Sequence, residues 1–375
     1  MSAERTLRVL TVMLVFAVAC DVEVTTLGAV TASSVNDDAG TPPDVAGPHP
    51  DADASLDVAE AEVVVDAPGA WTSLLMPTGI NNFRSVWLPR PDEPWVLGID
   101  TKPSIIGAPD GGFDSISSGE GGSVSFHGVL LRRVGGTWST LELSSVVNAV
   151  WGSTPDRVWV VGDDDLIVQT DGIGYSTHSP DVLDRFTAVW GTDADHVWVA
   201  GHDWMLRWNP TALRWMNEPL VGGYDSISAL WGSSDHDVWA VSTSGWIRHF
   251  DGTAWSVARD GVGLAGLDGV WGTGADDAWA VGEQGTILHW DGHTWTTTLS
   301  PTIRVLSGVW GSSKNDVWFV GEAGTILHWD GTKLAPFASP TTADLSSVGG
   351  TSATSAWAVG NDHAAGTGVM LRYQK

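Results

Sequence analysis

Hydrophobic and polar residues alternate in short blocks along most of the chain, and the pattern repeats about every 40 residues. In each repeat one strand ends near Trp-Gly, and a second Trp follows eight positions later inside a phrase close to Val-Trp-x-Val. The first position of the phrase is held by Trp87, Trp151, Trp190, Trp231, Trp271, Trp310 and, without the Trp, Gly349. The second is held by Trp95, Trp159, Trp198, Trp239, Trp279, Trp318 and Trp357. From Trp151 onward the spacings are 39, 41, 40, 39 and 39 residues, which predicts an array of identical units of four short strands.

The unit that begins at residue 267 shows how such a sheet is built. Residues 267–272, 278–281, 286–290 and 295–298 read as four strands joined by short turns. We interpret Asp291-Gly292, between the third and fourth strands, as a tight type I′ hairpin turn, in which both central residues need positive φ. Such hairpins predict an up-and-down antiparallel sheet that packs between two copies of itself. The corner recurs as Asp171-Gly172, Asp251-Gly252 and Asp330-Gly331, with Gly135-Gly136 as a variant.

The two ends of the array predict how it closes. The seventh unit stops near Tyr373, after its third strand, and the missing fourth strand precedes the first unit as residues 69–75. Closing the ring with this strand removes the free edge that an open array would expose. The sequence therefore predicts an all-β, seven-bladed β-propeller of four-stranded antiparallel blades, closed by the N-terminal strand, over residues 69–375.

One phrase of the repeat carries a resemblance to known proteins. Residues 309–331 read Val-Trp-Gly-Ser-Ser-x-x-Asp-Val-Trp-x-Val-Gly-x-x-Gly-Thr-Ile-Leu-His-Trp-Asp-Gly. This phrase resembles the Trp-rich, YVTN/BNR-like repeats of bacterial β-propellers, which are mostly found in envelope lipoproteins and extracellular proteins of unknown function. The resemblance covers about residues 69–375. It implies the propeller fold and an envelope location, and it implies no particular activity.

The composition restricts the partners. The chain has 45 acidic and 18 basic residues, a formal net charge of −27, so it would repel nucleic acid and other polyanions. Its 23 Trp residues fit the contacts between blades, because a Trp side chain buries roughly 150–250 Å². A single Cys excludes an intrachain disulfide. We expect a monomer that binds no nucleic acid and meets a membrane only through a lipid anchor.

The N-terminal 68 residues predict export and tethering. Arg5 and Arg8 precede an apolar stretch, residues 9–18, which is too short to span a bilayer, and Ala17-Val18-Ala19 then precedes Cys20. We interpret residues 1–19 as a signal peptide and Cys20 as the lipidated first residue of an outer-membrane lipoprotein. The alternative is a secreted or periplasmic protein cleaved at Ala-x-Ala. Residues 20–68 are acidic, lack aromatic residues, and predict a disordered tether.

Two loops depart from the repeat. The turn between the second and third strands of blade one grows by about 27 residues, and the equivalent turn of blade seven grows by five. Blades one and seven are neighbours in a closed ring, so the two loops predict a binding surface on one face. The alternative is an insertion that is tolerated without a role. The candidate residues in these loops are Lys102, Ile105, Ile106, Phe113, Asn361, Asp362 and His363.

Signals of chemistry are few. His249, His289 and His328 share one third-strand position that is Arg in other blades, so we expect a structural hydrogen bond within each blade rather than a metal site. Asp163, Asp164 and Asp165 follow one another in a turn of blade two, and their oxygens could ligate Ca²⁺, although a solvated turn is the simpler interpretation. We expect no other cofactor. No nucleophile elbow or P-loop is present, so no catalytic site is predicted.

Two functions remain open. The first is a tethered, non-enzymatic propeller that binds an envelope or extracellular protein through the loops of blades one and seven. The second is a carbohydrate-binding or glycoside-cleaving propeller, in which Trp204 and Trp246 stack on sugars. These two Trp residues fall outside the repeated positions, in turns on the same predicted face. We expect their rings to be exposed.

Overall fold

A computed structural model describes residues 69–74, 80–100, 127–223 and 225–375. These residues form seven four-stranded antiparallel sheets, the blades of a propeller. Blades one to six each take four consecutive strands, in the order first, second, third, fourth from the centre outward. Blade seven has the order β26-β27-β28-β1, so its outermost strand comes from the other end of the described chain. The seven-bladed all-β fold predicted from the repeat is confirmed.

The strands of blades one to three are β2 (Ile80–Trp87), β3 (Trp95–Asp100), β4 (His127–Val134), β5 (Thr137–Leu143), β6 (Val147–Thr154), β7 (Arg157–Gly162), β8 (Ile167–Thr170), β9 (Tyr175–Thr177), β10 (Phe186–Gly191), β11 (Val197–Gly201), β12 (Met205–Asn209) and β13 (Arg214–Asn217). Those of blades four to seven are β14 (Ile227–Ser234), β15 (Asp237–Ser242), β16 (Ile247–Phe250), β17 (Trp255–Arg259), β18 (Leu267–Gly274), β19 (Asp277–Gly282), β20 (Ile287–Trp290), β21 (Trp295–Thr297), β22 (Leu306–Ser313), β23 (Asp316–Gly321), β24 (Thr325–Trp329), β25 (Leu334–Pro336), β26 (Asp344–Ser352), β27 (Ser355–Asp362), β28 (Thr367–Gln374) and β1 (Ala70–Leu74). Two single 3₁₀ turns, η1 (Glu283–Gly285) and η2 (Glu322–Gly324), follow the second strands of blades five and six.

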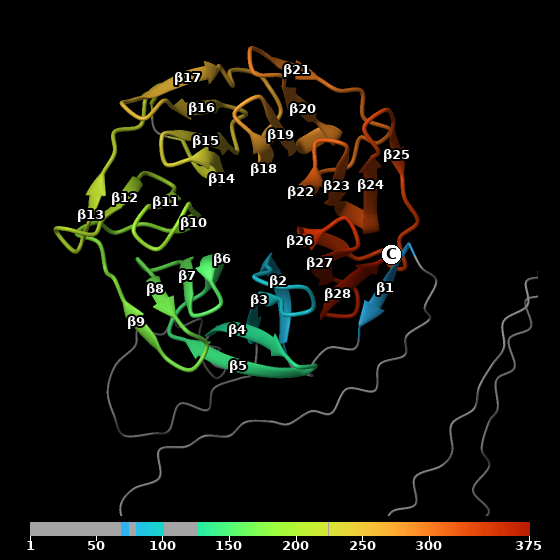
Figure 1. Cartoon of the computed structure of the whole chain (residues 1–375), viewed down its shortest axis with the longest axis horizontal. Helices are drawn as coiled ribbons and strands as arrows, with labels where there is room; N and C mark the ends of the chain where they lie inside the picture. The colour runs from blue at the N-terminus through green and yellow to red at the C-terminus, as the bar shows by residue number, and fades with distance from the viewer. Residues whose placement is uncertain (1–68, 75–79, 101–126, 224) are drawn as a thin grey trace, which may run out of the picture. The chain divides into compact units, whose positions relative to one another are not determined.

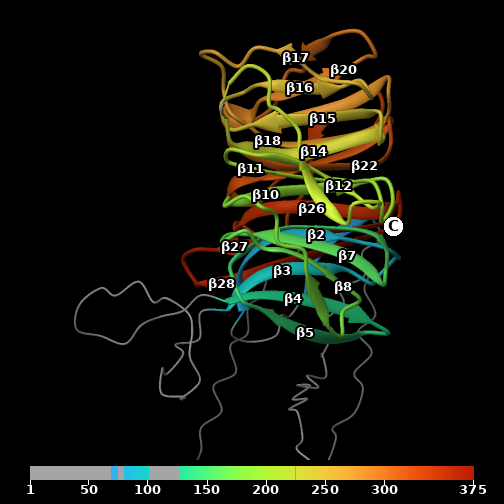
Figure 2. The same cartoon turned by 90° about the vertical axis from the view of Figure 1, so that its left-hand side faces the viewer.

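The seven first strands stand around a common axis, and each contacts the first strand of the next blade (Figure 1). β2 contacts both β6 and β26, which joins blade one to blades two and seven. β1 pairs with β28 in the register Trp71 to Tyr373, and the Trp71 ring meets Trp318 of blade six edge-on, 5.5 Å between centroids. Seen from the edge, the strands run between the two faces of the ring (Figure 2).

The Trp-Gly phrase is explained by a contact between neighbouring blades. The six-membered ring of the first Trp of one blade lies close against the Gly of the next. For example, a Cβ built on Gly311 would lie 2.7 Å from Cη2 of Trp271. The same close approach joins Trp87 to Gly152, Trp151 to Gly191, Trp190 to Gly232, Trp231 to Gly272 and Trp310 to Gly350. No side chain larger than hydrogen fits there, so the phrase is a packing requirement and not a ligand motif.

The one exception to the phrase occurs on both sides of one junction. Blade seven has Gly349 where the other blades have Trp, and blade one has Leu88 where they have Gly. Leu88 is buried, and its Cδ1 lies 3.4 Å from where a Cβ on Gly349 would stand. The large and small partners have therefore exchanged places, and the volume at the junction is kept.

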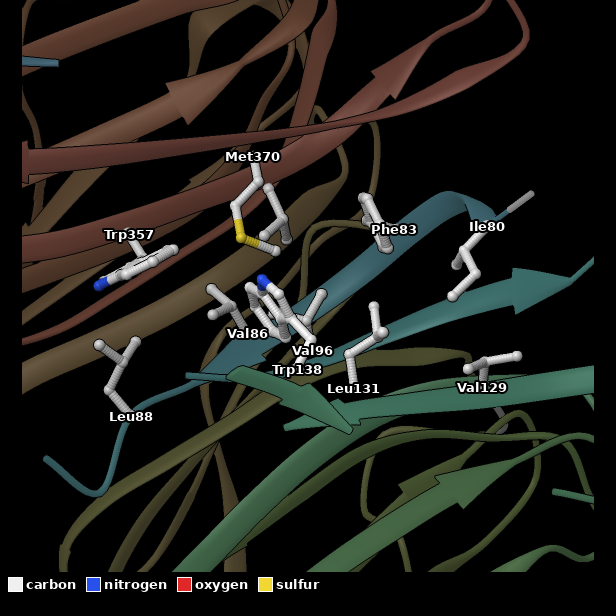
Figure 3. Packing of buried hydrophobic residues seen from close by; sticks show 11 residues of the cluster. Ile80, Phe83, Val86, Leu88, Val96, Val129, Leu131, Trp138, Trp357 and Met370 are labelled. Carbon is white, nitrogen blue, oxygen red and sulfur yellow. The ribbon is translucent and has the colours of Figure 1, made fainter. Parts of the chain in front are cut away.

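The second Trp of each repeat is the core of its blade. All seven, from Trp95 to Trp357, are at most 2% exposed. At the junction of blades seven and one, Trp357 and Met370 pack against Phe83, Val86 and residues of β3 to β5 (Figure 3).

The Asp-Gly corner differs from the prediction. Asp291 and Gly292 begin a four-residue loop between Trp290 and Trp295, which are paired. Only Gly292 of the two has positive φ, and the Asp291 carboxylate accepts hydrogen bonds from the backbone N–H groups of His293 and Thr294. The prediction of a type I′ turn is therefore wrong here. The Asp side chain instead forms an Asx-turn by accepting the backbone N–H groups that follow it, and Asp itself needs no positive φ. Among the described corners between third and fourth strands, Gly135-Gly136 is the two-residue turn in which both φ values are positive.

The predicted signal peptide (1–19), Cys20 and the tether (20–68) lie outside the described residues. Within the described ranges, no helix is long and apolar enough to cross a bilayer.

Candidate binding face

The two faces of the ring are built from different connections. The turn after each second strand and the loop into each next first strand share one face, called here the loop face. Backbone hydrogen bonds join the two kinds of connection, as from Asp163 N–H to the Val146 carbonyl (2.9 Å) and from Glu283 N–H to the Gly266 carbonyl (3.0 Å). The remaining turns, including the Asp-Gly corners, form the opposite turn face.

A β-bulge stands at the loop-face end of every first strand. In blade three, Phe186 pairs with Gly201 and Ala188 with Ala200, so Thr187 is the extra residue. An extra residue in a bulge is left without a ladder partner and its side chain is re-aimed. In blade one the irregularity is longer, and Arg84 is the last of three residues, 82–84, between the pairs Asn81–Ile99 and Ser85–Leu97. The residue at this position is polar in all seven blades: Arg84, Asn148, Thr187, Ser228, Asp268, Ser307 and Ser346, called here the bulge ring.

Bulge-ring side chains join consecutive blades. Asn148 Nδ2 donates to the Phe186 carbonyl (2.8 Å) and Thr187 Oγ1 to the Ile227 carbonyl (2.5 Å). Ser228 Oγ donates in the same way to the carbonyl of Leu267 (2.5 Å). Asp268 occupies this position in blade five, and an ionised carboxylate has no proton to donate. In the sequence, the signal of this ring is a polar residue three positions before the first Trp, or before Gly349 in blade seven. This signal was not used to predict the ring.

Charge is divided unevenly around the bulge ring. Burial, together with the carboxylates of Glu283 and Glu322, raises the pKa of Asp268 to about 6. Across the ring, Arg84 donates to Asn148 Oδ1, and Arg185 Nε lies 3.0 Å from Asp163 Oδ1. Burial and the nearby Arg185 lower the pKa of Arg84. The carboxylates of Asp268, Glu283 and Glu322 therefore interact at the loop face of blades five and six, where Arg304 also donates to the Ala323 carbonyl (3.0 Å). Arg84 and Arg185 lie at the loop face of blades one to three, among aspartates such as Asp163.

The loops of this face also expose large apolar side chains. Leu299 is 91% and Ile303 87% exposed in the loop between blades five and six. Val262 and Leu264 are exposed in the preceding loop, and Leu183 in the loop between blades two and three. These five side chains come from three loops on one face, which is therefore the candidate surface for binding a protein.

Trp204 and Trp246 lie on the loop face as predicted, but their rings are half-buried, so the expectation of exposed rings is wrong. Trp204 packs against the core between blades two and three. Trp246 stands between Gly222 and Gly261, where added Cβ atoms would come within 2.8 and 2.5 Å of its ring atoms. The guanidinium of Arg248 lies 5.3 Å from the Trp246 centroid. Gly222 and Gly261, which lie in other loops, thus leave room for the Trp246 ring to turn inward.

The predicted surface of blades one and seven is described only in part. Lys102, Ile105, Ile106 and Phe113 lie outside the described residues. Asn361 is buried and donates from Nδ2 to the Phe83 carbonyl (3.0 Å), so it joins the two blades and is no surface residue. The Asp362 carboxylate accepts from the N–H groups of Ala364 and Ala365, and His363 is exposed with Nε2 3.5 Å from an Asp344 oxygen.

The third-strand His residues make the expected hydrogen bonds within their blades. In blade five His289 Nε2 lies 2.7 Å from Asp277 Oδ1, Thr273 Oγ1 donates to Asp277 Oδ2 (2.6 Å), and the His289 ring stacks on Trp279 at 4.1 Å. Burial alone would raise the pKa of Asp277, but the hydrogen bonds from His289 and Thr273 outweigh it and the pKa is lowered. His249 and His328 repeat this arrangement with Asp237 and Asp316.

The three consecutive aspartates of blade two have separate partners. Asp163 binds Asn148 and Arg185, Asp164 accepts from the Ser145 hydroxyl (2.8 Å), and Asp165 accepts from the backbone N–H of Asp184 (2.8 Å). Within the ranges that the structure describes, no three His, Cys, Asp or Glu side chains are placed to hold a metal ion together.

Comparison with known proteins identifies the fold alone. No described protein family matches the chain, and no curated protein is similar to it in sequence. Among solved structures, YCF48 from Cyanidioschyzon merolae is 13% identical with a TM-score of 0.60, covering 81% of this chain and 98% of its own. YCF48 bound to D1 peptide is 15% identical with a TM-score of 0.60, covering 83% and 97%. A catalytically inactive virginiamycin B lyase from Staphylococcus aureus with quinupristin is 13% identical with a TM-score of 0.64, covering 82% and 99%. The chain is thus similar in fold to both binding proteins and an enzyme.

Proposed function

We propose that the chain is a membrane-tethered, extracytoplasmic propeller that binds a polypeptide partner on its loop face and catalyses no reaction. The observation that carries the proposal is that three loops of one face expose five large apolar side chains, with Leu299 and Ile303 in the same loop. Burying such side chains supplies the main favourable free energy of protein association, and nearby charges select the partner.

The charge of this face favours one kind of partner. Burial, and then the negative charges of Glu283 and Glu322, raise the pKa of Asp268, and a basic side chain placed among these carboxylates would relieve their repulsion. Leu299 and Ile303 lie in the loop between the same two blades. We therefore infer a partner segment in which apolar residues are flanked by Lys or Arg. The solved complex of a structurally similar propeller with a peptide supports recognition of this general kind.

The tether belongs to the proposal through the sequence of residues 1–68. A lipidated Cys20 would anchor the protein, as an outer-membrane lipoprotein or, if Ala-x-Ala is cleaved instead, leave it secreted or periplasmic. Replacing Cys20 by Ser should move the protein from the membrane to the soluble fraction on cell fractionation. Unchanged membrane association of the C20S variant would contradict lipid anchoring.

A matched pair of exposed isoleucines tests the face. Ile303 on the loop face is 87% exposed, and Ile173 in an Asp-Gly corner of the turn face is 86% exposed. In affinity capture from cell extract, we expect the wild-type chain and Ile173→Asp to retain the same polypeptide and Ile303→Asp to lose it. Equal retention by all three proteins, or loss with Ile173→Asp alone, would contradict the proposal.

A further inference from the structure

The rim between blades two and three contains a cavity of about 240 Å³. One wall is the end of β9 and the loop that follows it, with Thr177, His178 and Asp181. The other is the β12–β13 hairpin, with Trp208, Arg214 and Trp215. The two walls are joined by a hydrogen bond from Trp215 Nε1 to the His178 carbonyl (2.9 Å).

The cavity exists because the repeat changes at this junction. In blades four to six a third-strand His covers the second Trp of its own blade at 4.1 Å, but blade two has Gln169 at that position. His178, from the end of β9, covers Trp159 instead, 4.8 Å between centroids, and it also meets the Trp208 ring edge-on at 5.2 Å. The side chain that covers the second Trp therefore comes from the end of the fourth strand in blade two, and from the third strand in blades four to six.

Trp208 differs from the Trp residues at the same position in other blades. Trp290 donates its indole N–H to the Ala275 carbonyl (3.0 Å), and Trp329 donates to the Lys314 carbonyl (3.2 Å). Trp208 Nε1 makes no such bond to any residue in the described part of the chain. Its ring is half-buried and lines the cavity. Trp208 therefore offers an aromatic surface and an unused donor.

The polar lining carries no excess charge. Arg214 and Asp181 are both exposed and oppose each other in sign, and Thr177 adds a hydroxyl. Burial lowers the pKa of His178, so its imidazole is neutral near pH 7. A lining of this kind favours a neutral ligand with many hydroxyl groups over an ion.

We infer that the rim cavity formed by Thr177, His178, Asp181, Trp208 and Arg214 binds a single neutral sugar residue. The C–H face of a pyranose fits against an indole, and its hydroxyls pair with the planar guanidinium and carboxylate. The volume lies below the range of about 300–1,000 Å³ usual for drug-sized ligands, which suits one sugar ring. One wall of this site belongs to the loop between blades two and three, which also carries Leu183, but the site is separate from Leu299 and Ile303. It replaces Trp204 and Trp246 as the place for a sugar.

The test is saturation-transfer NMR of the full chain with the methyl glycosides of glucose, galactose, mannose and N-acetylglucosamine. We expect transfer to at least one glycoside, its loss in Trp208→Ala, and its retention in Trp290→Ala, the matched control in blade five. Arg214→Ala, an exposed change that leaves the core intact, should weaken binding about tenfold, as expected for a lost charged hydrogen bond. Absence of transfer to all four glycosides, or unchanged transfer in both Trp208→Ala and Arg214→Ala, would overturn the inference.

Discussion

The turn face and the loop face of this propeller use the same residue types for different purposes. On the turn face, Asp171, Asp251, Asp291 and Asp330 each accept two backbone N–H groups of their own corner, and these bonds lower the pKa of each carboxyl. At Asp330 the Thr332 hydroxyl is the largest cause, and together with the N–H groups it lowers the pKa to about 2. On the loop face, Asp268 has a raised pKa beside two other carboxylates. The turn-face carboxylates hold their corners. On the loop face Glu283 and Glu322 also accept backbone N–H groups, from Gly266 and Val305, and among these three loop-face carboxylates it is Asp268 that has the raised pKa.

The large apolar side chains also differ between the two faces. In the turn-face half of the first strands, each large side chain is matched by a Gly in the next blade, and the one exchange, Gly349 with Leu88, is made on both sides. The loop face leaves Leu299 and Ile303 almost fully exposed. A repeat protein can thus keep one side fixed by packing while the other side varies, and the irregular side is where recognition is expected.

The largest expected effect is on the turn face. Gly311→Ala would place a Cβ 2.5 Å from the Asp316 carbonyl and 2.7 Å from Trp271 Cη2, and the strand cannot move away without breaking the blade contact. We expect a loss of about 3 kcal/mol or more of unfolding free energy, measured by denaturant unfolding. Gly274→Ala is the control, because its Cβ would meet only an Asp276 oxygen at 3.5 Å. Equal stability of the two variants would remove the packing explanation of Trp-Gly.

Substitution of a loop-face carboxylate should raise the unfolding free energy, whereas Gly311→Ala should lower it. The pKa of Asp268 is about 6 in the folded state against 3.8 as the reference value, so its ionisation weakens the fold as pH rises from about 4 to 6. Asp268→Asn removes this penalty and supplies a donor like Asn148. The variant should therefore be more stable than wild type by at most about 3 kcal/mol at pH 7.5, and the gain should vanish near pH 4. A gain that does not depend on pH would show that the Asp268 charge is not its cause.

The exchanged junction predicts coupling between two substitutions. Trp310→Gly with Gly350→Leu copies the Gly349–Leu88 pair into the neighbouring junction. Each single change should destabilise, the first by a cavity and the second by a clash, and the double variant should recover about 1–2 kcal/mol of their summed cost. If the losses of unfolding free energy of the two single variants simply add in the double variant, Gly349 and Leu88 do not compensate for each other at the natural junction.

The smallest effect on stability is expected at the most exposed loop-face residue. Leu299→Asp should change the unfolding free energy by no more than about 0.5 kcal/mol, since the side chain is 91% exposed. A larger loss, measured in the same denaturant series, would assign Leu299 to the framework and weaken its role in recognition.

The architecture could be predicted because its cause recurs in every repeat. Trp and Gly meet at six of the seven junctions, so the phrase, its period and the number of blades can all be read along the chain. The binding face could not be predicted in the same way. The inward turn of Trp246 depends on Gly222 and Gly261 in other loops, and the sugar cavity depends on Gln169 replacing a His that three other blades possess. Such features are set by contacts between segments that follow no period.

The most direct test of recognition on the loop face is photo-crosslinking in intact cells. Benzoylphenylalanine would replace Leu299 on the loop face in one protein and Ile173 on the turn face in another; the two side chains are 91% and 86% exposed. The account predicts a discrete polypeptide adduct from position 299 and none from position 173. Adducts from position 173 alone, or from neither position, would contradict it.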